Sequence, residues 1–205
     1  MHSIQTRFFN YGQEQTDYLK QADPVIGAAI SRIGKIERVV MPDPFTALVY
    51  AIVGQLISAK AVHTIWENMQ TQLGELTPQR LSSVTADDIQ RCGLTMKKAV
   101  CIHQIAEAIV QGKLDLNELN ELPDEDVIRK LMALKGVGRW TAEMLLLHAY
   151  ERPDIVSWGD IAIRRGMMKL YGLDALTKDQ FEQYRTGYSP YGSVASLYLW
   201  VISFE

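Results

Sequence analysis

Apolar residues recur along this chain at steps of three and four, the spacing of an amphipathic helix. The most regular stripe runs over residues 45–56 and consists of Phe45, Leu48, Val49, Ile52, Val53 and Leu56. Asp43 and Pro44 precede it with the chemistry of an N-cap and a first helical turn. We therefore expect an amphipathic helix here.

Short helices with their own start and stop signals fill much of the remaining chain. The signals are, in chain order, Thr85 with Asp88 and then Gly93, Thr95 and then Gly112, Pro123 with the acidic residues 124–126, and Ser189 with Pro190 before the apolar face of Val194, Leu197, Tyr198, Val201 and Ile202. No run alternates strictly between apolar and polar residues, so strands are expected only as short pieces near residues 4–9 or at Val39 and Val40. The sequence predicts an all-α protein, and without linker or repeat it predicts a single domain over residues 1–205.

Composition narrows the class of protein. A chain of 205 residues with 47% hydrophobic content can build a sizeable core. No signal-peptide pattern occurs, nor the roughly 18 to 20 apolar residues of a membrane span, so we expect a soluble intracellular protein without membrane contact, in the cytoplasm or nucleoid if bacterial. Cys92 and Cys101 are too few for an iron–sulfur cluster and poorly spaced for zinc or a disulfide framework. A formal net charge of −3 argues against coating nucleic acid through bulk charge, so any DNA contact must be local.

The most informative segment is the turn at residues 134–143, Leu-Lys-Gly-Val-Gly-Arg-Trp-Thr-Ala-Glu, between two helix-patterned stretches. Gly136 and Gly138 allow a tight backbone turn that can approach a bulky partner. The helix that follows presents free N–H groups and a positive dipole end, which suit a phosphate oxygen. Asp160 follows twenty-two residues after Gly138. This turn together with an aspartate at that spacing suggests an enzyme acting on DNA.

The arrangement from Pro123 to Tyr150 resembles the helix–hairpin–helix element of the DNA glycosylase superfamily, in its 3-methyladenine DNA glycosylase II branch. Further matching segments, from about Asp23 to Phe204, are residues 43–45 through 53–58, residues 93–95 with 97–99, residues 122–124, residues 158–160 with Arg164, and residues 189–191 through 199–200. The resemblance implies two helical subdomains flanking a DNA-binding cleft, with the hairpin element at about 123–150. It also implies a monomer acting on damaged double-stranded DNA, with no redox or organic cofactor.

In this resemblance Asp160 is the catalytic residue. A carboxylate can stabilise the positive charge that develops on the sugar as the glycosidic bond breaks, or orient a water for attack. The alternative is that Asp160 only caps the helix that follows it, and both roles can hold together because a cap can leave one oxygen for chemistry.

The resemblance places Leu56 as the wedge that fills the gap left by an extruded base, with Gln55 beside it reaching base edges and Ser58 in the same DNA-contacting loop. The pattern alone favours the alternative that Leu56 ends the stripe begun at Phe45. The backbone amides of Gly136, Val137, Gly138 and Arg139, with Lys135 and Thr141, are the expected phosphate contacts. Carbonyls of Met132, Leu134 and Gly136 are a candidate site for a monovalent cation; no other metal site is expected.

Trp140 stands where the bifunctional members of the family carry a lysine that forms a Schiff base with the sugar. Because tryptophan cannot do so, we expect a monofunctional enzyme that leaves an intact abasic site. Lys135 comes too early in the turn to replace that lysine.

An alkylated base carries positive charge and is attracted to aromatic faces. The candidate pocket residues are Trp140, Met144, Trp158, Tyr198 and Trp200. Tyr198 is equally compatible with a core position, Trp66 is expected in the core, and Met144 replaces a pocket tyrosine of some relatives and so shifts the substrate range.

Some residues leave two interpretations open. Gly192 stands where relatives often have arginine, which puts one backbone contact in doubt. The histidines His63, His103 and His148 have no partners at metal-ligand spacing, and Lys97 and Lys98 fit a solvated helix start better than a phosphate contact.

The sequence thus predicts a monofunctional DNA glycosylase that excises alkylated bases of the 3-methyladenine and 7-methylguanine type. The alternatives are the same chemistry on uracil or hypoxanthine, and a non-catalytic helix–hairpin–helix protein that only binds DNA damage.

Overall fold

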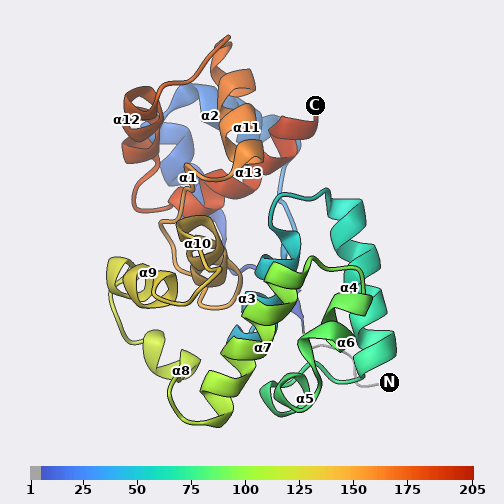
Figure 1. Cartoon of the computed structure of the whole chain (residues 1–205). Coiled ribbons are helices and arrows are strands. Elements are labelled where there is room, and N and C mark those ends of the chain that lie inside the picture. Colours follow the sequence, from blue (N-terminus) through green and yellow to red (C-terminus); the bar gives the residue numbers. More distant parts are fainter. Residues whose placement is uncertain (1–5) are drawn as a thin grey trace. The chain divides into compact units, whose positions relative to one another are not determined.

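The computed structural model describes residues 6–205, and the regular secondary structure of these residues is almost entirely helical (Figure 1). Its helices are α1 (Gln13–Ala22), α2 (Pro24–Ile33), α3 (Pro44–Gly54), α4 (Ala59–Leu73), α5 (Pro78–Ser83), α6 (Ala86–Arg91), α7 (Met96–Val110), α8 (Leu116–Leu119), α9 (Asp124–Met132), α10 (Arg139–His148), α11 (Ile161–Tyr171), α12 (Lys178–Tyr188) and α13 (Gly192–Phe204). The prediction of an all-α fold is confirmed. None of these helices is long and apolar enough to cross a bilayer.

Two short strands, β1 (Arg7–Phe8) and β2 (Val39–Val40), form an antiparallel ribbon. Arg7 pairs with Val40 and Phe8 with Val39. Strands were expected at these two places, and both are present; residues 4 and 5 of the first predicted segment lie outside the described residues.

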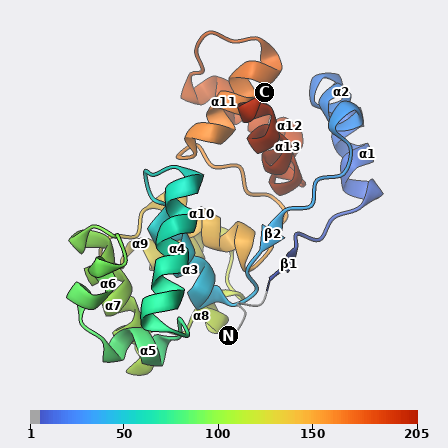
Figure 2. The same ribbon diagram turned by 90° about the vertical axis from the view of Figure 1, so that its right-hand side faces the viewer.

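The chain divides into two compact units. In the described residues, unit 1 consists of Thr6 and residues 41–150 and holds α3 to α10. Unit 2 consists of residues 7–40 and 151–205 and holds the ribbon, α1, α2 and α11 to α13. Unit 2 is therefore built from both ends of the chain, as its blue and its orange to red segments show in Figure 2.

Helix α3 is the core element of unit 1. Asp43 caps it, accepting a hydrogen bond of 2.7 Å from the Thr46 N–H, as its sequence predicts. The expected amphipathic stripe is wrong in one respect, because the small residues Thr46, Ala47 and Ala51 are buried as well. Small side chains let α4, α7 and α10 pack around α3, so this helix is buried on nearly all sides.

Unit 2 is organised around the crossing of α11 and α13. A Cβ added to Gly166 would lie 2.0 Å from the carbonyl oxygen of Leu199, so only glycine lets the two backbones approach so closely. The predicted face of α13 is buried except for the partly exposed Val201. This crossing fixes α11, whose first residue follows Asp160.

Candidate active site

The hairpin between α9 and α10 is a tight turn at Gly136, which has a φ of +94°. A Cβ at Gly136 would lie 3.0 Å from the Cys101 Sγ of α7, so the turn needs glycine for its backbone angle and for its close packing. The Val137 N–H donates to the Leu134 carbonyl at 3.1 Å. That amide serves the turn itself, which argues against the predicted phosphate contact at Val137.

Helix α10 begins at Arg139, and its N-cap residue Gly138 provides no side-chain cap. A ten-residue helix with an uncapped N-terminus attracts anions through its first N–H groups and its dipole. Lys135 is exposed beside this turn. The phosphate contacts through Lys135, Gly138 and Arg139 therefore stay a prediction that suits the local geometry.

Leu56 projects from the loop between α3 and α4. Its side chain is 95% exposed and its φ is +57°, a left-handed conformation that costs a leucine about 1 kcal/mol or more. The interpretation of Leu56 as the end of the α3 stripe is wrong, because the helix ends at Gly54 and Leu56 is outside the core. An exposed apolar side chain on a strained backbone is the geometry expected of a wedge.

Gln55 connects this loop to the hairpin. Its side-chain Nε2 donates to the Gly136 carbonyl at 3.1 Å and to the Thr141 Oγ1 at 2.9 Å. Thr141 is only 2% exposed. These contacts qualify two expectations. The buried Thr141 hydroxyl accepts from Gln55, so a phosphate contact at Thr141 would use its backbone N–H. Both N–H groups of the Gln55 Nε2 are engaged, so donation to a base edge would require one of these two bonds to break.

Two further polar residues shape the same loop. The Ser58 hydroxyl caps α4 by accepting from the Ala61 N–H at 3.3 Å, and Ser58 stays exposed, so its predicted DNA contact remains open. The Lys98 ammonium donates to the carbonyls of Val53 (2.9 Å) and Gln55 (2.7 Å). Lys98 is therefore not the solvated residue that its position at the start of α7 suggested.

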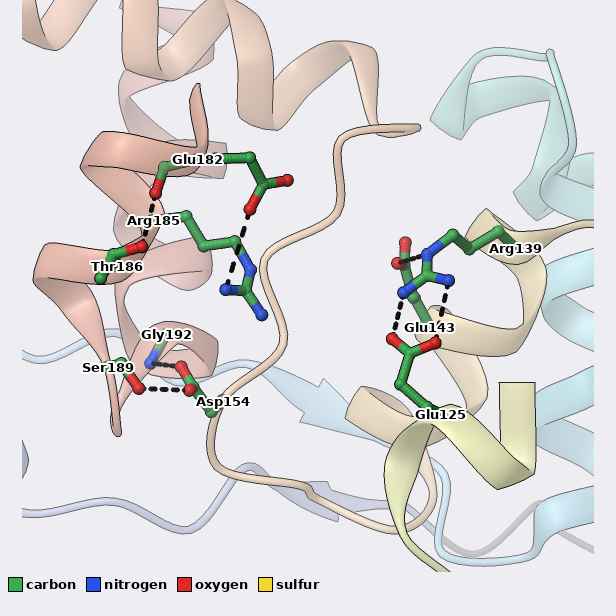
Figure 3. A network of polar contacts seen from close by, with 9 residues as sticks. All are labelled: Glu125, Arg139, Glu143, Asp154, Glu182, Arg185, Thr186, Ser189 and Gly192. Carbon is green, nitrogen blue, oxygen red and sulfur yellow. Dashed lines mark hydrogen bonds and ion pairs between the residues drawn. The ribbon is translucent and has the colours of Figure 1, made fainter. Parts of the chain in front are cut away.

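The exposed Arg139 side chain pairs with two carboxylates of unit 1 (Figure 3). Its guanidinium forms ion pairs with Glu125 of α9 and with Glu143 of α10, where the Nε to Oε1 distance is 2.9 Å. The hydrogen bond from Glu125 raises the pKa of Arg139 above its ordinary value. The side chain thus braces the hairpin, and a phosphate contact at this residue would use its backbone N–H.

The hydrogen bonds of the carbonyls proposed to bind a monovalent cation show whether their oxygens can also act as cation ligands. The Leu134 carbonyl accepts from Val137 and the Gly136 carbonyl from Gln55. A carbonyl oxygen has two lone pairs, so one hydrogen bond leaves room for a cation ligand. A cation at Met132, Leu134 and Gly136 is compatible with this geometry and stays a prediction.

In unit 2, Asp160 caps α11. Its Oδ1 accepts from the N–H groups of Ala162 (2.9 Å) and Ile163 (3.0 Å). Because both cap bonds go to a single oxygen, the cap fixes the carboxylate without involving Oδ2. Asp160 is 9% exposed, and its own N–H donates to the Ser157 carbonyl at 3.2 Å. The cap and a catalytic role are therefore compatible.

The segment that leads to Asp160 is tied to α13 by two fully buried serines. The Ser193 hydroxyl accepts from the Ile155 N–H at 2.9 Å and donates to the Arg152 carbonyl, and the Ser196 hydroxyl donates to the Ile155 carbonyl at 2.7 Å. Sequence reasoning missed both residues. The available signal was a pair of serines three residues apart on an otherwise apolar helix, where each hydroxyl needs a partner.

Asp154 anchors the same segment to the start of α13 (Figure 3). Its carboxylate accepts from the Ser189 hydroxyl at 2.6 Å and from the Gly192 N–H at 3.0 Å. A Cβ at Gly192 would lie 2.5 Å from the Asp154 Oδ1. The absence of a side chain at Gly192 therefore makes room for this anchor.

The predicted pocket residues differ in their surroundings. In unit 1, Trp140 is half-buried, with its Cη2 3.8 Å from a Cβ built on Gly54, and Met144 is 4% exposed. In unit 2, the Trp158 ring lies under the Arg164 guanidinium (4.8 Å to the centroid) and meets Phe181 edge to face.

Trp200 and Tyr198, both on α13, differ in exposure. Trp200 is half-buried and carries the Arg38 guanidinium 4.6 Å above its ring centroid. Tyr198 is 1% exposed and donates to the Gly34 carbonyl at 2.9 Å, and burial raises its pKa. The structure favours the core interpretation for Tyr198, as it does for the 7%-exposed Trp66.

Two of the histidines have acidic neighbours on their own helices. His63 faces Glu67 at 3.2 Å and His103 faces Glu107 at 3.4 Å. Among residues 6–205 no group of three or more His, Cys, Asp or Glu side chains is arranged to hold a metal ion.

The hairpin, the exposed Leu56 and the capped Asp160 are the features by which the sequence resembles a family of DNA repair proteins, and a comparison with known protein families tests that resemblance. Residues 49–190 match the model of the HhH-GPD superfamily of base excision DNA repair proteins, and the chain belongs to this superfamily. The resemblance to helix–hairpin–helix DNA glycosylases is thereby confirmed.

Individual relatives within the superfamily are named as 3-methyladenine DNA glycosylases. The chain is 30% identical to DNA-3-methyladenine glycosylase 1 of Schizosaccharomyces pombe over 166 residues, covering 78% of this chain and 73% of the relative. A DNA-3-methyladenine glycosidase structure from Bacillus halodurans is similar over 98% of this chain and 93% of its own, with 30% identity and a TM-score of 0.78. The S. pombe 3-methyladenine DNA glycosylase in complex with abasic DNA has 26% identity and a TM-score of 0.83, covering 92% of this chain and 95% of that one.

Proposed function

We propose that this protein is a monofunctional DNA glycosylase that extrudes alkylated bases of the 3-methyladenine and 7-methylguanine type from double-stranded DNA and hydrolyses their glycosidic bonds. The observation that carries the proposal is the capped carboxylate of Asp160 in a chain whose relatives are named 3-methyladenine glycosylases. The protein acts as a monomer and needs no organic cofactor.

Asp160 supplies the charge that this chemistry requires. As the bond between the sugar C1′ and the base nitrogen breaks, the base leaves with the electron pair and positive charge develops on the sugar. Water then forms the new C1′–O bond and gives up a proton, which leaves an abasic site. A carboxylate held by two N–H groups through Oδ1 is oriented before the substrate binds, so little reorganisation is needed in the transition state.

Leu56 and the hairpin supply the access to the base. A base must leave the stack before its glycosidic bond can be reached, and an apolar wedge that fills the gap lowers the cost of unstacking. The 95% exposed Leu56 suits this role. The uncapped start of α10 beside Lys135 suits a phosphate of the same strand.

The absence of lyase chemistry follows from Trp140. A lyase step needs an amine that attacks the sugar and forms a Schiff base, and an indole nitrogen cannot do this. Trapping with borohydride tests this part directly, because a covalent protein–DNA adduct would contradict it.

Base release from methylated DNA tests the proposal as a whole. We expect the wild-type protein to release 3-methyladenine or 7-methylguanine, and the Asp160→Asn variant to bind DNA without releasing either. Asparagine is as good an N-cap as aspartate, so this variant removes the charge while keeping the start of α11 intact. Binding without release by the wild type would instead identify a non-catalytic damage-binding protein.

A second candidate function is the same chemistry on uracil or hypoxanthine. The observation that favours it is the buried thioether of Met144. The family resemblance puts a tyrosine at this position in some relatives, so methionine here would remove an aromatic face and a hydroxyl from the pocket. A panel of lesion-bearing duplexes separates the two candidates by the base released fastest.

A further inference from the structure

The wedge loop, defined as residues 55–58 between α3 and α4, is held by an ammonium group from another helix. The Lys98 Nζ donates to the Val53 carbonyl at 2.9 Å and to the Gln55 carbonyl at 2.7 Å. Carbonyls at the C-terminus of a helix have no partner within the helix and carry its negative dipole end. Lys98 therefore neutralises the end of α3 immediately before Leu56.

The two hydrogen bonds from Lys98 fix the backbone immediately N-terminal to Leu56. Leu56 is the residue with a φ of +57°, which a leucine adopts only when its surroundings compensate for the strain. Its side chain is 95% exposed, so core packing does not hold it in place. The constraint must come from the neighbouring backbone, and the Gln55 carbonyl that Lys98 binds belongs to the peptide unit that leads into Leu56.

Gln55 gives this constraint a second support. Its backbone carbonyl is bound by Lys98, while its side-chain amide is bound to Gly136 and Thr141 of the hairpin and α10. One residue thus connects the wedge loop to α7 and to α10. All of these groups belong to unit 1.

We infer that Lys98 is a positioning residue for the wedge, which acts on base extrusion through Leu56 and does not touch the base or the sugar. The inference rests on the proposed function, since it assumes that Leu56 enters the DNA stack. Burial lowers the pKa of Lys98, as expected of an ammonium group withdrawn from water to serve two carbonyls.

Lys97 offers a matched control. It is the adjacent residue on α7 and is exposed, whereas Lys98 is half-buried. Lys97→Met and Lys98→Met each remove one positive charge from the same helical turn. A contribution of bulk charge to DNA binding would affect both variants alike, but the loss of the carbonyl contacts affects only the second.

The decisive experiment compares single-turnover excision from two duplexes, one with 7-methylguanine paired to cytosine and one with the same lesion in a small unpaired bubble. Extrusion costs less in the bubble, so a wedge matters less there. We expect Lys98→Met to slow excision about tenfold on the paired lesion and less than about twofold in the bubble. Lys98→Arg, which can donate to both carbonyls, is expected to retain most of the rate.

A double-mutant cycle tests whether Lys98 acts through Leu56. If it does, adding Lys98→Met to Leu56→Ala causes little further loss on the paired lesion, because the wedge is already gone. Three results would each overturn the inference. The first is an equal loss of excision rate on both duplexes for Lys98→Met, and the second is an equal loss of rate in Lys97→Met and Lys98→Met. The third is a double variant whose loss of rate is the product of the two single losses.

Base extrusion can also be followed without chemistry. In the Asp160→Asn background, the fluorescence of 2-aminopurine next to the lesion is expected to rise on binding and to rise less when Lys98→Met is added.

If Lys98→Met does not fold, Lys98→Gln replaces it, because the shorter side chain keeps a polar group but cannot span both carbonyls. A wild-type protein that releases no base from either duplex would contradict the proposed function itself, whereas an active wild type with any overturning pattern contradicts only the role of Lys98.

Discussion

The side-chain amide of Gln55 donates to the hydroxyl of Thr141 at 2.9 Å, and this bond joins the loop after α3 to the first turn of α10. The two residues are far apart in the sequence, and the sequence places both among the DNA contacts. Because Thr141 is 2% exposed, the bond belongs to the interior of unit 1. The loop that carries Leu56 and the hairpin turn proposed to bind phosphate are in this way parts of one hydrogen-bonded structure.

Thr141→Val should therefore weaken both stability and DNA binding. The substitution keeps the shape of the side chain but removes the acceptor of Gln55, at an expected cost of about 1 kcal/mol in the free energy of unfolding. Thr141→Ser keeps the hydroxyl and serves as the control. Urea unfolding measures the difference, and equal stability of the valine and serine variants would show that the bond contributes nothing.

Gly166→Ala tests the helix crossing on which α11 depends. The new Cβ would lie 2.0 Å from the Leu199 carbonyl oxygen, so α11 and α13 must separate, and we expect a loss of about 3 kcal/mol in the free energy of unfolding. Gly187→Ala in α12 is a suitable control because nothing lies within 4 Å of its Cβ position. It should stabilise the protein by roughly 0.5 to 1 kcal/mol. Similar melting temperatures for the two variants would contradict the close approach.

Ser196→Ala tests the tie between α13 and the segment before Asp160. It removes the donor to the Ile155 carbonyl, a buried group that then lacks this partner, and should cost about 1 to 3 kcal/mol. Because Ile155 lies five residues before the proposed catalytic residue, we also expect a lower rate of base release with DNA affinity unchanged. Ser83→Ala, at an exposed serine that bonds only within its own helix, is the control.

Alkaline pH should destabilise the protein through its buried thiols. Burial raises the pKa of Cys101 from 9.0 to about 11, and it raises the pKa of Cys92 as well. Between pH 9 and 11 the unfolded chain loses these protons while the folded chain keeps them, so the stability that is complete below pH 9 falls as the pH rises. The expected contribution of Cys101 is on the order of 2 kcal/mol.

Cys101→Ala separates this contribution from that of the buried tyrosines, which act in the same direction. The variant should be less stable at neutral pH, since it leaves a cavity, but should lose less stability between pH 9 and 11. An unchanged slope would contradict the assignment. Slow reaction of both cysteines with a thiol reagent until the chain unfolds would support it.

The elements of the fold were predictable where local chemistry decides them. The capping box of Thr85 and Asp88 is present at the start of α6, and the short strands occur at the two expected places. Leu56 was harder, because its spacing continues the α3 stripe and nothing local shows that the helix ends at Gly54. Only the resemblance to the glycosylase family indicated that it leaves the core.

The supports of the site could not be predicted for a different reason. Lys98, Ser193 and Ser196 act on backbone groups distant in sequence, so their partners appear only once the helices are packed. Local patterns treat a lysine at a helix start as solvated. The contacts of Gln55 with Gly136 and Thr141 were hidden in the same way, since the family resemblance assigned both polar side chains to DNA contacts.

The measurement that tests the central claim most directly is the release of 7-methylguanine from duplex DNA by the wild type and by Asp160→Asn, with DNA affinity measured on the same preparations. Removing a carboxylate that stabilises a developing positive charge is expected to slow release by at least about a hundredfold while affinity changes little. Wild-type binding without release, or equal rates for the two proteins, would contradict the assignment of Asp160 as the catalytic residue of a DNA glycosylase.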